Sequence, residues 1–131
     1  MENDAAPKGT VLIIDDDDFV RAMVTKLVKS FGYAPIGARD GFEALDILSR
    51  MEAPAVVITD IVMPKMDGLE MLRQLRAKYP QLKIIAMSGG GRSEQGDYLE
   101  LARKSGANEI VSKPINPRQL RDILQQLAQV K

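Results

Sequence analysis

Three acids, a hydroxyl and an amine stand at the carboxyl-terminal ends of short apolar runs in this sequence. Asp15 and Asp16 follow the first run, and Asp60 follows the third. Ser88 follows the fourth run, and Lys113 comes two residues after the last. If the runs are strands of one parallel sheet, ligands bind beyond their carboxyl ends, so the topology delivers most of these side chains to one pocket.

The charges in such a pocket call for a cation. Two like charges about 4 Å apart repel by roughly 4 kcal/mol at an effective dielectric near 20. Three carboxylates are therefore unfavourable together unless a proton or a cation compensates them. Lys113 can offset one charge, and a hard divalent ion suits the remainder. Mg²⁺ typically takes one or two carboxylates, keeps several waters and shares oxygens with a phosphate, so the cluster predicts an incomplete cation site that awaits a phosphoryl group.

Five apolar runs supply the strands that this pocket needs. Four of them are Val11–Ile14, Ala55–Thr59, Ile84–Met87 and Ile110–Val111. The first three are rich in Val and Ile without alternation, which is typical of strands covered on both faces. A weaker run at Tyr33–Gly37 contains Pro35, which cannot donate to a ladder and therefore predicts an edge strand.

Between the runs, the apolar spacing changes to that of amphipathic helices. The clearest set is Val20, Met23, Val24, Leu27, Val28 and Phe31. Further helices are predicted at Leu45–Leu48, Leu69–Leu75, about 94–105 and Leu120–Leu127. The expected caps are Gly32 and Gly106 at helix ends, and Asp67 and Asn116 (before Pro117) at helix starts. This alternation predicts a doubly wound α/β fold, a five-stranded parallel sheet with helices on both faces.

The composition narrows the chemistry further. The 131 residues include no cysteine and no histidine, so a metal site must be built from oxygen ligands, which favours Mg²⁺, Ca²⁺ or Mn²⁺. The net charge of zero and the pI of about 6.3 argue against direct binding of nucleic acid. The polar start MENDAAPKG is unlike a signal peptide, and no apolar run approaches the ~18 residues of a membrane span. We expect a cytoplasmic protein with no membrane insertion.

Five segments together resemble the response-regulator receiver family, the CheY-like domains of two-component signalling. They are VLIIDDDDFVR, DGFEAL, VVITDIVMPKMDGLEML, IIAMSGGG and GANEIVSKP. The likeness extends from about Val11 to the C-terminal helix, and the order and spacing of the motifs make it specific. It implies a flavodoxin-like sheet with strand order 2-1-3-4-5. We expect residues 10–131 to form the receiver domain, after a flexible tail at residues 1–9.

The resemblance also implies a metal site. Asp16 would bind Mg²⁺ directly, with Asp60 and the backbone carbonyl of Val62 as further ligands. Asp15 would orient a metal-bound water or share in the metal site.

The same likeness implies how a phosphoryl group would be handled. Asp60 would be the nucleophile that attacks a phosphohistidine on a histidine kinase or a histidine phosphotransfer protein. Ser88 would hydrogen-bond one phosphoryl oxygen, and Lys113 would pair with another. The peptide bond between Lys113 and Pro114 would be cis.

Three departures from the family pattern qualify the resemblance. Receivers often carry Tyr or Phe where this chain has Ile110, so an aromatic switch coupled to Ser88 is unavailable in its usual form. Val62 and Gly90, two residues after Asp60 and Ser88, cannot hydrogen-bond an attacking water through a side chain. The glycine run at 89–91 predicts a loop that moves.

We expect a stand-alone, non-enzymatic switch that signals by protein contact through its fourth helix, fifth strand and fifth helix. The alternative is a receiver cut from a larger DNA-binding regulator or hybrid kinase. A remote alternative is a Mg²⁺-dependent phosphatase. Aspartate phosphatases of the haloacid dehalogenase type need a second acid where this chain has Val62.

Overall fold

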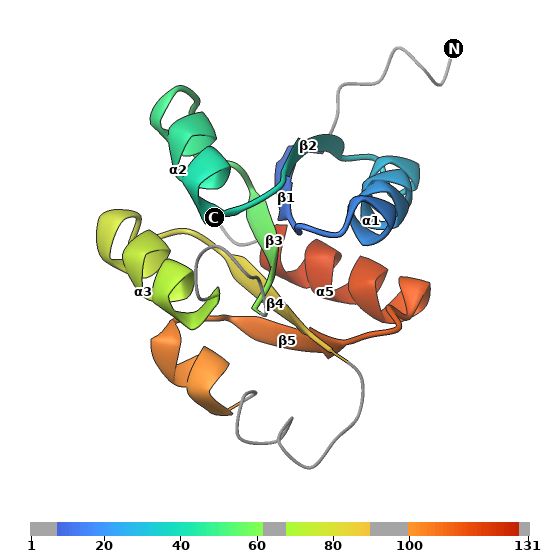
Figure 1. Ribbon diagram of the computed structural model, residues 1–131. Helices are drawn as coiled ribbons and strands as arrows, with labels where there is room; N and C mark the ends of the chain where they lie inside the picture. The colour runs from blue at the N-terminus through green and yellow to red at the C-terminus, as the bar shows by residue number, and fades with distance from the viewer. Residues whose placement is uncertain (1–7, 62–67, 90–99, 129–131) are drawn as a thin grey trace.

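The fold is an open α/β sheet with helices on both faces (Figure 1). The structure is a computed structural model that describes residues 8–61, 68–89 and 100–128. The strands are β1 (Thr10–Ile14), β2 (Ala34–Ala38), β3 (Val56–Asp60), β4 (Ile84–Ser88) and β5 (Glu109–Ser112). The helices are α1 (Asp18–Ser30), α2 (Gly41–Ser49), α3 (Gly68–Lys78) and α5 (Pro117–Ala128). Residues 100–105 are also helical and belong to the helix predicted at about 94–105.

All five strands are parallel, in the order β2-β1-β3-β4-β5, which confirms the predicted topology. β2 is an edge strand, as Pro35 indicated. The strand ends differ slightly from the prediction, because Asp60 and Ser88 are the last residues of their strands rather than the first after them. Their polarity does not end the ladder, since Asp60 still pairs with Met87 on the neighbouring strand.

Alternate residues of the central strands build two separate cores. On one face, Leu12, Val57 and Ile84 pack with buried side chains of α2 and α3. On the other face, Ile13 and Ile58 pack with buried side chains of α1 and α5. Figure 1 shows this division, with α1 and α5 on one side of the sheet and α2 and α3 on the other. Burial on both faces explains why the strands are continuously apolar.

The predicted inner face of α1 is correct except at its margin. Val24 and Val28 are fully buried, whereas 38% of Met23 is exposed. Met23 lies one position, about 100°, around the helix from Val24, and so falls on the flank of the buried stripe. Phe19, on the first turn, is 81% exposed. The helix therefore presents an apolar strip beside its buried face.

The predicted helix caps are present wherever the structure describes them. Gly32 and Gly106 have φ angles of +102° and +124°, the left-handed region that glycine adopts without a steric penalty. The side-chain oxygen of Asn116 accepts a hydrogen bond from the backbone of Gln119 at 3.1 Å, as an N-cap does. Asp67 lies outside the described residues, as do residues 1–7, and the division into tail and domain stays a prediction. No helix of the described part of the chain is long and apolar enough to cross a membrane.

Candidate functional site

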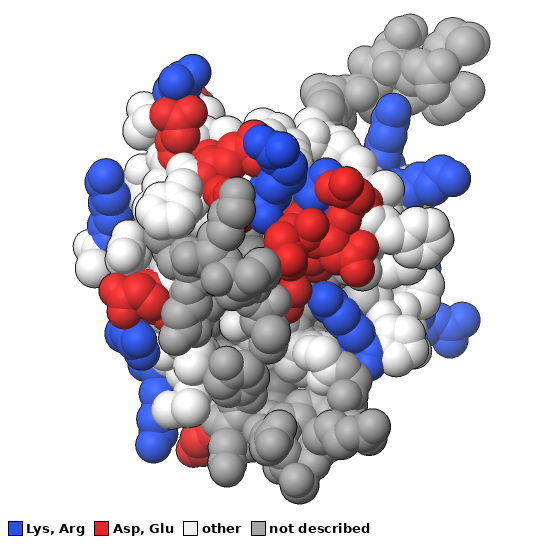
Figure 2. Space-filling model, viewed as in Figure 1, with Lys and Arg blue, Asp and Glu red and all other residues white. Residues whose placement is uncertain are grey.

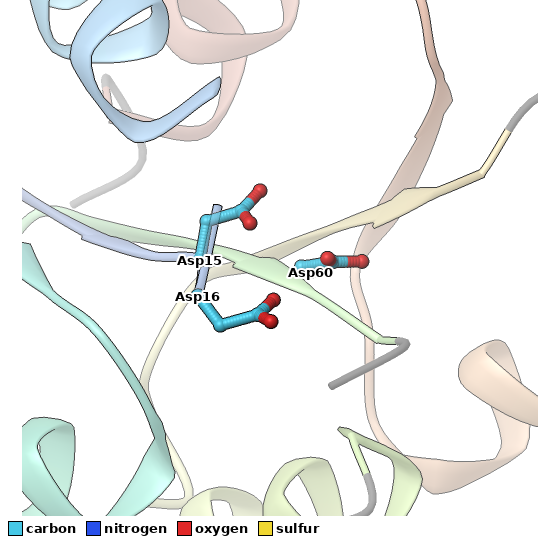
Figure 3. Close-up of side chains that lie close together, drawn as sticks. All are labelled: Asp15, Asp16 and Asp60. Carbon is cyan, nitrogen blue, oxygen red and sulfur yellow. The ribbon is translucent and has the colours of Figure 1, made fainter. Parts of the chain in front are cut away.

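Three carboxylates meet at the carboxyl edge of the central strands. β1 leads into Asp15 and Asp16, and the adjacent β3 ends in Asp60. One oxygen from each carboxylate lies within 4.8 Å of the others, and Figure 3 shows Asp60 across from the two neighbouring acids. Asp15 and Asp60 are buried, whereas Asp16 is exposed. Figure 2 shows acidic side chains gathered at the centre of this face with basic side chains beside them.

Lys113 brings a positive charge to this cluster. Its Nζ atom lies 3.3 Å from Oδ2 of Asp60 and 3.4 Å from Oδ2 of Asp15. The residue stands directly after β5, where its backbone N–H donates to the carbonyl of Ser88 at 2.9 Å. Its peptide bond to Pro114 is cis, as the resemblance implied. The prediction that Lys113 lies among the acids is thus correct in position.

The pKa values of the paired groups show how the charges balance. Burial raises the pKa of the Asp15 carboxyl above its ordinary value, and the nearby charge of Asp60 raises it further. The backbone N–H of Asp17 and the ammonium of Lys113 oppose this shift without cancelling it. Burial opposes the charged form of Lys113, but Asp60 and Asp15 outweigh burial and hold its pKa above the ordinary value. One ammonium does not neutralise the site, which leaves a demand for more positive charge.

The remaining predicted site residues are placed in part. Ser88 ends β4, is 1% exposed and pairs in register with Ser112 on β5. It therefore lies at the same edge of the sheet as the acids. Val62 and Gly90 lie outside the described residues, so the metal ligand predicted at Val62 stays a prediction. Ile110 is partly buried against the α2–α3 side of the core.

One residue of this region carried no prediction from sequence. Arg21 of α1 donates from Nη1 to the backbone carbonyl of Asp15 at 2.8 Å. It also donates from Nη2 to the carboxylate of Asp18 at 2.6 Å. The i, i+3 spacing of Asp18 and Arg21 on a helix could have indicated their ion pair from the sequence, but it does not indicate the contact of Arg21 with the Asp15 carbonyl.

We expect Asp15→Asn to raise the free energy of unfolding of the metal-free protein at pH 7 by about 1 to 3 kcal/mol, because it removes one of three repelling charges. The pKa of Asp15 is raised by folding, so the folded state binds the proton more tightly than the unfolded chain does. Above the folded pKa the ionised carboxylate costs stability, and this cost disappears as the pH falls through that value. The advantage of the variant should therefore shrink between pH 7 and pH 4.

Urea unfolding of both proteins in EDTA, at several values of pH, measures this difference. The magnitude of the advantage at pH 7 tests the repulsion, and its pH dependence tests the raised pKa. An advantage that stays constant or grows as the pH falls would contradict the raised pKa of Asp15.

The donor set of the site suits a small hard cation. Carboxylate oxygens are the side-chain ligands that Mg²⁺ prefers, and two of the three acids stand on consecutive residues. Asp16 is exposed to solvent, so waters and a phosphate would be able to supply further oxygens to a cation held by these carboxylates. This arrangement can hold a cation and a phosphoryl group close to Asp60.

Comparisons with known proteins agree with this geometry. A family model described as the response regulator receiver domain matches residues 11–125. The chemotaxis protein CheY of Listeria monocytogenes is 36% identical over 119 residues, covering 90% of this chain and 97% of that protein. The sensor kinase CckA of Brucella abortus is 35% identical over 118 residues, covering 89% of this chain but 12% of the kinase.

A solved structure from Clostridium thermocellum, a response regulator receiver domain protein, has a TM-score of 0.83 and 29% identity. The match covers 91% of this chain and 93% of that one. Receiver domains bind Mg²⁺ at an acidic pocket and interact with histidine kinases and downstream targets. The chain therefore belongs to the family of response regulator receiver domains of two-component signalling.

Proposed function

We propose that this receiver is a switch in which Asp60 accepts a phosphoryl group. The observation that carries the proposal is the placement of Asp60 at the end of β3, with Lys113 Nζ at 3.3 Å and two further carboxylates beside it. A strand-end carboxylate with no chemical role would not require an ammonium and two further carboxylates beside it. A carboxylate that must receive a phosphoryl group does need this setting, because positioning and charge neutralisation supply most of the catalysis in phosphoryl transfer.

Asp15, Asp16 and Asp60 would hold Mg²⁺, with the backbone carbonyl of Val62 as a further ligand. Three carboxylates with one ammonium leave excess negative charge, and their spacing within 4.8 Å suits a divalent ion. When bound, Mg²⁺ neutralises charge on the phosphoryl oxygens as the nucleophile approaches.

The chemical step proposed for Asp60 is a displacement at phosphorus. One carboxylate oxygen forms the new O–P bond, and the P–N bond to the donor's imidazole breaks. The electron pair leaves with the imidazole nitrogen, so the products are an aspartyl phosphate and a free histidine side chain. Because this chain contains no histidine, the donor is another protein or domain, a histidine kinase or a histidine phosphotransfer protein.

Lys113 and Ser88 would bind the phosphoryl group after transfer. Lys113 already lies 3.3 Å from the Asp60 carboxylate, so its ammonium can pair with an oxygen attached there. Ser88 ends the neighbouring strand β4 at the same edge and offers a hydroxyl donor. Ile110 stands where an aromatic residue would relay this contact to the output surface in many family members, and we infer a different relay in this chain.

CheY-like receivers act generally as switches rather than as turnover enzymes. We infer the same for this chain, with the helix predicted at about 94–105, β5 and α5 as the surface that contacts the downstream protein. The relatives include one that the chain matches nearly end to end and one in which it matches 12% of the length. The relatives therefore include proteins that consist of a receiver alone and larger proteins that contain a receiver as one part.

Acetyl phosphate tests the proposed phosphoacceptor directly. We expect the protein incubated with Mg²⁺ and acetyl phosphate to gain about 80 Da, the mass of one phosphoryl group. Asp60→Asn should show no gain, and neither should wild type in EDTA. Ser30→Ala, far along α1, is the matched control and should gain mass as wild type does. An adduct undiminished in Asp60→Asn would exclude Asp60 as the acceptor.

A further inference from the structure

Asp15 is held in place at four separate atoms. Its backbone N–H donates to the carbonyl of Ala38 at 3.1 Å. Its carboxylate accepts from the backbone of Asp17 at 2.9 Å and lies 3.4 Å from Lys113 Nζ. Its own carbonyl accepts from Nη1 of Arg21 at 2.8 Å. Two of these partners are side chains. Lys113 contacts the Asp15 carboxylate, whereas Arg21 contacts the Asp15 backbone carbonyl and none of the three clustered carboxylates.

We propose that Arg21 is a positioning residue for the metal site. It fixes the peptide bond between Asp15 and Asp16, and through it the direction of the Asp16 carboxylate. This inference rests on the proposed Mg²⁺ site.

The rigidity of the peptide unit transmits this contact. The carbonyl of Asp15, the N–H of Asp16 and both Cα atoms lie in one plane. A hydrogen bond from Arg21 to that carbonyl therefore limits rotation of the plane and of the Cα–Cβ direction of Asp16. Asp15 is fully buried and has its own restraints, but Asp16 is exposed, so packing restrains it less. The orientation of the peptide plane matters most for Asp16.

Arg21 can do this because its own side chain is fixed. Its guanidinium also pairs with Asp18 at 2.6 Å, and only 20% of the side chain is exposed. Its stem lies over β2 at Gly37, where an added Cβ would meet the Cδ of Arg21 at 3.4 Å. The arginine thus links β1, α1 and β2, and a side chain held by packing and two hydrogen bonds keeps its partner in place.

The positive charge of Arg21 and its hydrogen bond to the Asp15 carbonyl have opposite expected effects on the affinity for Mg²⁺. A cation near a Mg²⁺ site repels the metal, so loss of the charge alone would tighten binding. Loss of the hydrogen bond to the carbonyl would weaken binding, because outer-shell contacts typically carry 10- to 100-fold in metal affinity. The two explanations therefore differ in sign, and substitutions at this position separate them.

Titration with Mg²⁺, followed by two-dimensional amide NMR, measures the affinity of folded molecules alone. Arg21→Met keeps most of the stem over Gly37 and removes the charge and both donors. Arg21→Lys keeps the charge but cannot bridge two acceptors as a planar fork does. We expect both variants to weaken Mg²⁺ binding, by roughly tenfold for Arg21→Met and by less for Arg21→Lys.

Two controls isolate the contact with the carbonyl. Asp18→Asn removes the charge of the partner of Arg21 but keeps a side-chain oxygen that can accept from Nη2, so Arg21 stays held and still donates to Asp15. The affinity should therefore change less than about twofold, as expected for an 84% exposed partner. Arg50→Met removes one positive charge at the far end of α2 and should change it equally little.

The outcomes separate this inference from the proposed function. Wild-type binding with unchanged or tighter binding by Arg21→Met would overturn the positioning role and leave the metal site standing. Absence of binding by wild type would overturn the metal site itself, and the inference with it. If Arg21 had a purely structural role, its loss would lower the folded fraction, and native amide signals would be lost. The remaining native signals would keep the wild-type Mg²⁺ midpoint, and that result would also overturn the proposal.

Discussion

Arg76→Ala is expected to lower the free energy of unfolding by about 3 kcal/mol, although the residue lies far from the acids. Nη1 donates to the carbonyls of Pro80 and Leu82 at 2.8 and 2.6 Å. Nη2 donates to the carbonyl of Gly106 at 2.7 Å and to the side chain of Asn108 at 2.9 Å. One guanidinium thus ties the end of α3 to the segments that lead into β4 and β5.

The magnitude follows from the charge on the donor and from burial. Hydrogen bonds from a charged group contribute about 1.5 to 3 kcal/mol each, but carbonyls near the surface recover water when the donor is lost. Burial lowers the pKa of Arg76, which shows that its charge is partly removed from solvent. Four such bonds, discounted for rehydration, leave about 3 kcal/mol. Asn108 would lose its hydrogen bond from Arg76, but its side-chain oxygen would still accept from the backbone N–H of Ile84 at 2.8 Å.

Arg73→Ala is the matched control for Arg76→Ala. Arg73 is on the same helix, is 54% exposed and pairs with Glu70 at 3.1 Å. An exposed pair contributes between zero and 1 kcal/mol, so this variant should lose less than 1 kcal/mol. Urea unfolding of the three proteins measures both changes. Equal losses for the two variants would show that the contacts of Arg76 do not set its contribution.

The fold was predictable because its signals are local and repeated. Strands covered on both faces must be apolar throughout, and Val11–Ile14 and Ile84–Met87 show this directly. The candidate site was predictable for a topological reason, since carboxyl ends of neighbouring parallel strands share an edge. Asp15, Asp60 and Lys113 are distant in sequence, yet this rule places them together.

The contacts that depend on tertiary packing were not predictable from the sequence. Arg21 and Arg76 read as ordinary surface residues of amphipathic helices. Each has one side-chain partner, but the contacts argued above as structurally important are mostly with backbone carbonyls of other segments, and a carbonyl has no residue type that a sequence could reveal. Met23 shows the same limit, because its position on the margin of the buried stripe depends on how α1 sits on the sheet.

Lys113→Met is expected to destabilise the metal-free protein by about 2 kcal/mol and to slow phosphoryl uptake by roughly a hundredfold or more. Removing one partner of a buried ion pair costs about 3 to 5 kcal/mol. The cost is smaller here because the Lys113 side chain is 23% exposed and Asp15 can take up a proton instead. The kinetic loss is that of one group that stabilises charge in a transition state, about 10²- to 10³-fold.

Mg²⁺ separates these two effects, because a divalent ion can neutralise the acids but cannot replace the ammonium as a partner of the phosphoryl group. Saturating Mg²⁺ should therefore recover most of the lost stability in urea unfolding while uptake from acetyl phosphate stays slow. Lys104→Met, at an exposed position, should leave both measurements unchanged. A rate of uptake equal to that of wild type in saturating Mg²⁺, together with recovered stability, would mean that Lys113 serves only to hold the metal-free site together. A rate that stays low would place the contribution of Lys113 in the proposed transfer step, in which Asp60 would gain the phosphoryl group and the negative charge that comes with it.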